Sequence, residues 1–289
     1  MNYQRKGWRR FVPKKRHTPK AKPGSIEHIL YEALNNVRQS FRGTIHPSQL
    51  DEPIEELKQR VRGFDGAEKA AMLEALVVLQ TPRAAVAQDD MDRHKHNYHD
   101  RTKRLFELID FNDTFVDTVL SLPPEQLPNF AEHIKHHMLR FCAQYKLPML
   151  SDEQYEAIVH GLSREIAVYL GAKTEGLDAE MTSRAGDAFG IDMVISDPTT
   201  GKRINVDCKT PSAFRHRLGE LVHEGRITED QLYTADVDDY ISVENRRDEE
   251  RVLVTIMCIR PEDLGEVVNF TFVDTAPLGR LLRKIIATS

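Results

Sequence analysis

The sequence contains few cysteines and no long apolar run. Its three cysteines, Cys142, Cys208 and Cys258, stand far apart, so they lack the CxxC spacing of a zinc or redox site. No apolar run approaches the roughly 20 residues of a membrane-spanning helix, and the N-terminal region lacks the apolar stretch of about 7 to 15 residues that a secretory signal requires. We therefore expect a cytoplasmic protein with reduced thiols and no membrane association.

Acidic residues are missing from residues 1–24, which contain nine lysines and arginines. The remainder has 31 basic and 45 acidic residues, a net charge of −14, so the chain carries a basic arm on an acidic body. Basic side chains interleaved with Trp8 and Phe11 can neutralise phosphates and stack on bases. We expect the arm to bind nucleic acid, and a merely solvated terminus is the alternative. The arm residues expected to contact nucleic acid are Arg5, Lys6, Arg9, Arg10, Lys14, Lys15 and Arg16.

Residues 25–148 are predicted to form an all-α N-terminal domain. Apolar residues recur at three- and four-residue steps from Ile26 to Phe41, which is the period of a helix, and Ser25 is a suitable N-cap. Breaks are expected at glycines and prolines, among them Pro82. Further helices are expected near residues 53–61, 68–79, 103–120 and 127–145.

Residues 149–289 combine helix and strand patterns. Ser151 and Gln154 form a capping box at the start of a helix that we expect to end at Gly171. β-rich runs at 190–196 and 203–209 flank turn-forming residues, which predicts a β-hairpin. Further strands are expected at 251–259 and 267–273, and a helix at about 277–286. This order is typical of a mixed α/β domain.

The hairpin would gather charged side chains. Side chains alternate along a strand, so Asp207 and Lys209 share one face while Val206 and Cys208 point the other way. Strand pairing can bring Asp192 near Asp207, although the sequence does not fix the register. Two carboxylates beside a lysine favour a hard divalent cation with oxygen ligands. We therefore expect Mg²⁺ at this position, with Mn²⁺ able to replace it.

The segments Gly190-Ile191-Asp192 and Val206-Asp207-Cys208-Lys209 resemble the D…(D/E)xK signature of the PD-(D/E)XK nuclease superfamily, which includes restriction endonucleases and junction resolvases. The resemblance implies a restriction-endonuclease-like mixed sheet flanked by helices, with the signature on a central hairpin. It also implies that Asp192 and Asp207 bind Mg²⁺, that Lys209 is the catalytic lysine, and that the Cys208 carbonyl is a further ligand. Ile191 stands where the family name has proline.

Glu165 and Arg184 are further candidate site residues because of their positions in the sequence. Many members of the superfamily add a glutamate from the preceding helix, and Glu165 resembles it. Glu165 also shares the face of an apolar stripe, where an unpaired carboxylate is costly. The alternative is that Glu165 lies at the edge of the stripe and pairs with Arg164 or a neighbouring lysine. Arg184 is a candidate phosphate contact or a surface ion pair. Other acids that can compete for the ligand role are Asp178, Glu180 and Asp187.

Three further patterns are interpreted as solvated polar faces. Two histidine groups have neither the H-E-x-x-H arrangement nor a nearby cysteine ligand, and the mixed-charge run 244–251 is typical of an exposed loop or helix face. The histidine groups are His94, His96 and His99, and His133, His136 and His137.

The residues and the resemblance together predict a Mg²⁺-dependent DNA endonuclease, with an exonuclease also open. A restriction-type enzyme would act as a homodimer, because two active sites are needed to cut both strands of a duplex. RNA remains open as the substrate, since nothing identifies an element that reads bases. A different class is a non-catalytic nucleic-acid-binding or assembly protein that keeps a nuclease-like fold.

Overall fold

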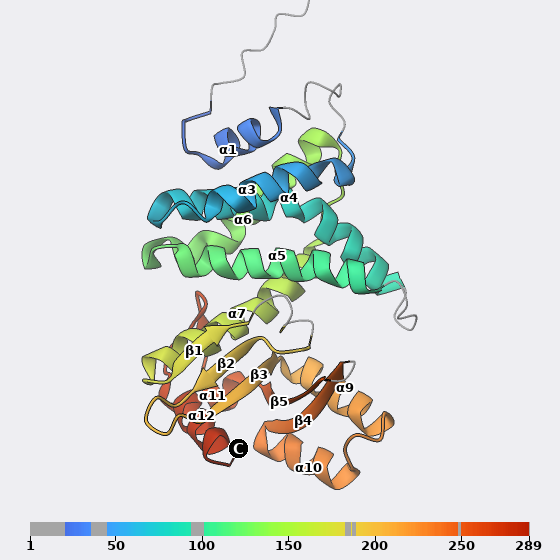
Figure 1. Ribbon diagram of the computed structural model, residues 1–289, viewed down its shortest axis with the longest axis vertical. Helices are drawn as coiled ribbons and strands as arrows, with labels where there is room; N and C mark the ends of the chain where they lie inside the picture. Colours follow the sequence, from blue (N-terminus) through green and yellow to red (C-terminus); the bar gives the residue numbers. More distant parts are fainter. Residues whose placement is uncertain are drawn as a thin grey trace, which may run out of the picture.

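The computed structural model describes residues 21–35, 45–93, 101–182, 186, 189–247 and 250–288. The arm residues 1–20, the histidines at 94, 96 and 99, Arg184 and Asp187 lie outside these ranges, so the predictions made for them remain predictions. Figure 1 shows a stack of helices above a part that combines a sheet with helices.

The regular elements described before Pro148 are helical. α1 begins after its predicted N-cap Ser25, whose side chain accepts a hydrogen bond from the His28 amide. In chain order the helices are α1 (Ile26–Ala33), the 3-10 helix η1 (Pro47–Leu50), α3 (Asp51–Val61), α4 (Gly66–Arg93), α5 (Arg101–Ser121), the 3-10 helix η2 (Pro124–Asn129) and α6 (Phe130–Tyr145).

The predicted break at Pro82 is wrong, because α4 runs through this proline. Proline removes one hydrogen bond from a helix interior, but α4 is covered by its neighbours, and Thr81 donates to the Val77 carbonyl at 2.9 Å. By length and composition alone, α4 is also apolar enough to cross a membrane. The prediction that no apolar run approaches the length of a membrane-spanning helix is therefore wrong. Its apolar window is 78% buried within the protein, which is the pattern of a core helix.

Helix α7 (Asp152–Thr174) starts with the predicted capping box of Ser151 and Gln154 but does not end at Gly171. A Cβ atom at Gly171 would lie 2.6 Å from the Leu278 side chain of α12 (Ala276–Thr288). Glycine therefore serves close helix packing here and does not terminate the helix. The chain turns instead at Gly176, which has a positive φ of 77°.

Within the described residues, five strands form a mixed sheet in the order β1-β2-β3-β5-β4. The predicted hairpin is present as β2 (Met193–Ser196) and β3 (Arg203–Lys209), which pair antiparallel, and β3 is the middle strand. Strand β5 (Glu250–Cys258) runs parallel to β3, as the crossover through α9 (Pro211–His223) and α10 (Glu229–Asp238) allows.

The sequence reasoning missed or misjudged several elements at the margins of this sheet. Strand β1 (Asp178–Met181) was not predicted. The interpretation of residues 244–251 as a loop or helix face is wrong, because β4 (Tyr240–Arg247) pairs antiparallel with β5. The strand expected at 267–273 is divided into β6 (Val267–Val268) and β7 (Thr271–Phe272), which follow the short helix α11 (Pro261–Leu264).

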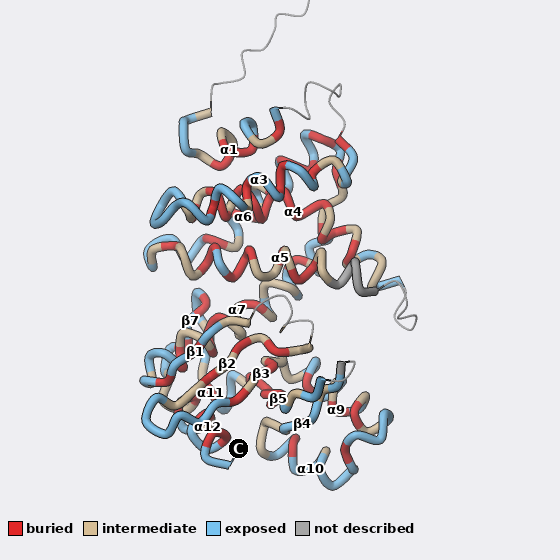
Figure 2. Tube along the Cα trace, viewed as in Figure 1, coloured by how far each residue is buried: buried red, intermediate tan, exposed pale blue. Residues whose placement is uncertain are grey.

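Two layers of helices cover the sheet. One face packs on α7 and α12, and the other packs on α9 and α10. Buried stretches follow both β3 and the long helices above the sheet in Figure 2. Every regular element thus takes part in a core, and the molecule is a mixed α/β protein in which helix predominates.

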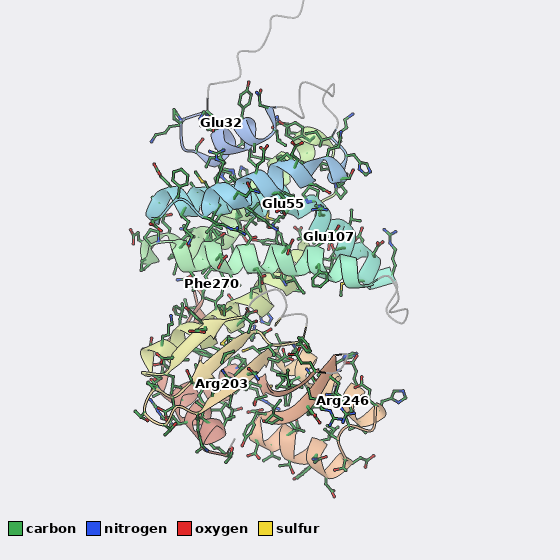
Figure 3. The ribbon with its side chains drawn as sticks, viewed as in Figure 1. Glu32, Glu55, Glu107, Arg203, Arg246 and Phe270 are labelled. Carbon is green, nitrogen blue, oxygen red and sulfur yellow. The ribbon has the colours of Figure 1, made fainter. Side chains whose placement is uncertain are left out.

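The core of the upper helices continues across residue 148. It includes Leu162 and Ile166 of α7 and also Phe270 from the turn between β6 and β7. The Phe270 ring lies 6.2 Å from that of Phe115 on α5 and 6.3 Å from that of Phe130 on α6. Figure 3 labels Phe270 directly beneath α5. This shared core fixes α5 relative to the sheet.

Candidate active site

The middle strand carries the first charged pair. Asp207 is opposite Ile256 of β5, whereas Cys208 is opposite Met257. Ile256 packs toward α9 and Met257 toward α7, so Asp207 faces the α9 layer and Cys208 the α7 layer, as alternation requires. Lys209 donates a hydrogen bond from its ammonium to the Asp207 carboxylate.

Asp192 immediately precedes β2 and reaches across to β3. Its amide donates to the Val206 carbonyl at 2.8 Å, and its own carbonyl accepts from the Thr182 amide at 3.0 Å. With the backbone held on both sides, the Asp192 carboxylate accepts a hydrogen bond from the Cys208 amide at 2.6 Å. The structure therefore brings Asp192 beside the segment that carries Asp207 and Lys209.

The site has more negative than positive charge. Burial raises the pKa of Asp207 to about 7, and the charge of Asp192 adds to this, while Lys209 and Arg217 oppose it. Burial also raises the pKa of Asp192, against the attraction of Lys209 and the hydrogen bond from Cys208. For Lys209, burial opposes the charged form, but the two carboxylates outweigh it and raise its pKa. Two buried carboxylates thus share one ammonium group.

Lys209 and Asp192 open onto a cavity of about 570 Å³, which Glu165 of α7 and Cys208 also line. Burial raises the pKa of the Cys208 thiol, and the charges of Asp192 and Glu165 contribute, so Glu165 is electrostatically close to this cluster. Asp207 is only 6% exposed and is not among the residues that line the cavity. The structure therefore places Glu165, Asp192, Cys208 and Lys209 around one cavity, and Asp207 joins them through its contact with Lys209.

A loop encloses Asp207 from the other side. Gly190 has a positive φ of 74°, and a Cβ atom there would lie 4.0 Å from the Asp207 Oδ2 atom. The preceding residue, Phe189, accepts a hydrogen bond through its carbonyl from the side-chain Nδ2 of Asn245 at 2.8 Å. Arg226 in turn donates to the Asn245 Oδ1 atom at 2.8 Å. Glycine is thus the residue that fits this backbone next to the carboxylate.

The residues fit a divalent cation through charge and donor type. Asp192 and Asp207 supply oxygen ligands whose buried charge is not fully balanced, the Cys208 carbonyl is a neighbouring oxygen, and water would complete the shell. However, no group of three or more His, Cys, Asp or Glu side chains that could hold a metal exists within the described ranges. Glu165 therefore lies on the same cavity without forming such a group with the two aspartates.

Other predicted candidates lie elsewhere. Asp178 and Glu180 are exposed on β1, away from the lining of the cavity. On α6, the rings of His133 and His137 are 4.6 Å apart, and His137 lies 3.5 Å from Glu27 of the neighbouring helix α1.

Sequence reasoning missed the contribution of α5 to the cavity wall. Asn112, Asp113, Val116 and Asp117 line the side opposite α7. Burial raises the pKa of Asp117, while Lys69 opposes this. Asp113 and Asp117 are four residues apart and therefore share a helix face, which is a weak signal in the sequence. Their distance of about 50 residues from Glu165 along the chain hides their common position.

No family model, curated protein or solved structure matches this chain. Its function must therefore be argued from the site itself.

Proposed function

We propose that this protein is a metal-dependent nuclease of the PD-(D/E)XK type that hydrolyses phosphodiester bonds with Mg²⁺. The observation that carries the proposal is the meeting of Asp192, Asp207 and Lys209 at the end of the middle strand, beside a cavity. A central hairpin, a mixed sheet between helices and Glu165 on the preceding helix agree with what the resemblance implies.

Each residue has a role that follows from its position. Asp192 and Asp207 would hold the cation together with the Cys208 carbonyl, and a bound Mg²⁺ would supply charge stabilisation and a more acidic water. The ammonium of Lys209 faces the cavity and is held by Asp207, so it can orient a water molecule and stabilise negative charge on the phosphate. Glu165 can accept a hydrogen bond from that water across the cavity.

DNA is the proposed substrate and endonucleolytic cleavage the proposed reaction, with a homodimer as the proposed assembly. The basic arm, through Arg5, Arg9 and their neighbours, and Arg184 are proposed phosphate contacts. RNA is the competing substrate. These parts of the proposal depend on charge patterning in the sequence.

A non-catalytic nucleic-acid-binding protein is the second candidate function. The direct ion pair between Lys209 and Asp207 favours it, because two groups that neutralise each other can serve structure alone. The described part of the chain also has no group of three or more side chains that could hold a metal, and a protein that only binds nucleic acid does not require one. Catalysis is therefore the property that separates the two candidates.

The test is incubation of the purified protein with plasmid, single-stranded DNA and RNA in Mg²⁺, Mn²⁺ or EDTA. We expect cleavage products in Mg²⁺ and Mn²⁺ and none in EDTA, because the buried carboxylates need a cation to accept a phosphate. Binding of DNA without cleavage in any metal would refute the nuclease proposal and support the binding protein.

A further inference from the structure

Helix α5 forms one wall of the cavity that contains Lys209. Figure 1 shows α5 crossing the end of the sheet, with α7 beneath it. The cavity between them, of about 570 Å³, falls in the range of roughly 300 to 1,000 Å³ typical of pockets that enclose a small ligand. A duplex, whose major groove alone is about 12 Å wide, is too broad for such a space. A single nucleotide unit is of the right size class.

The wall is firmly packed. Phe111 and Phe115 of α5 are fully buried, and Phe115 contacts Phe130 and Phe270, with ring centroids 5.2 and 6.2 Å apart. Lys58 of α3 also makes an ion pair of 3.1 Å with Asp110 of α5. Displacing α5 would expose these aromatic side chains to water, which is unfavourable. A paired duplex therefore cannot open the site by pushing the helix aside.

The chemistry of the wall suits a base better than a phosphate. Asp113 and Asp117 lie on it, and like charge would repel a phosphate from that side. Phosphate is thus directed toward Lys209. Val116 and Leu162 supply apolar contact for a ring.

We propose that the cavity takes an unpaired nucleotide of a single nucleic-acid strand, with its phosphate at Lys209 and its base against α5. The inference rests on the proposed nuclease function and narrows its substrate class.

The experiment compares cleavage of one labelled strand in three forms: as a free single strand, as an overhang and in a blunt duplex. Covalently closed plasmid is included as a fourth substrate. We expect kcat/KM for the unpaired forms to exceed that for the blunt duplex by about 100-fold or more, because unpairing costs a few kcal/mol. Equal cleavage of single strand and closed duplex would overturn this inference and leave the nuclease proposal standing. No Mg²⁺-dependent cleavage of any substrate would remove the proposed function and this inference with it.

Discussion

The three variants Asp192→Ala, Asp207→Ala and Lys209→Ala should each lose Mg²⁺-dependent cleavage and keep most of their DNA binding. Removal of either carboxylate takes away a ligand of the cation, and removal of the ammonium takes away the group that faces the phosphate. Losses of about 10²- to 10³-fold in kcat are expected, since a single stabilising group at a reacting centre commonly contributes 10² to 10³. The measurement is single-turnover cleavage of a labelled strand, with binding followed by fluorescence anisotropy in EDTA.

The control for these variants is Asp178→Ala. Asp178 is exposed on β1, so its loss removes one negative charge from the same sheet without touching the cavity. The Asp178→Ala protein should cleave at the rate of the unmodified protein. Unimpaired cutting by the Asp207→Ala protein would overturn the assignment of the active site, because that carboxylate is buried against Lys209 and belongs to the proposed centre.

The metal-free protein should lose stability as the pH rises. The pKa of Asp207 is raised from 3.8 to about 7 in the folded protein, so folding takes up a proton between these values. The folded state therefore becomes less favourable as pH increases from about 4 to about 7, and above 7 the full cost of the buried charge is present. The pKa of Asp192 is raised too, which acts in the same direction.

Asp207→Asn should remove most of this pH dependence. We expect the variant to exceed the unmodified protein in unfolding free energy at pH 8 by on the order of 2 kcal/mol, and to match it more closely near pH 5. Added Mg²⁺ should stabilise the unmodified protein and not the variant, because a ligand of the folded state raises stability by mass action. Chemical denaturation at several pH values, with EDTA or Mg²⁺, measures both effects. If Asp207→Asn loses as much stability between pH 5 and pH 8 as the unmodified protein does, the buried charge of Asp207 is not the cause.

The hairpin could be predicted because its signals are local. Alternation along residues 203–209 and turn chemistry before Arg203 depend on neighbouring residues, and the structure reproduces both. Strand β4 could not be recognised in the same way. Glu244 and Arg246 are exposed on it, and a mixed-charge run on an edge strand has the composition of a solvated loop.

Tertiary packing decided the features that the sequence did not show. A glycine such as Gly171 is typical of a helix end, but here the side chain of Leu278, which is distant in the chain, packs against it. Pro82 is retained inside a helix because neighbouring helices cover it. The position of Asn112 on the cavity depends on where α5 crosses the sheet, and no periodicity within α5 contains that information.

The most direct test of the central claim is calorimetric titration of Mn²⁺ and Mg²⁺ into the metal-free protein near pH 7. We predict saturable binding with release of protons, visible as a dependence of the heat on the buffer, because the Asp207 carboxyl has a pKa of about 7 and must be ionised to bind a metal. Both the binding and the proton release should disappear in Asp192→Asn and in Asp207→Asn. Unchanged metal affinity in a variant that carries both substitutions would contradict the claim that these two carboxylates form the metal centre.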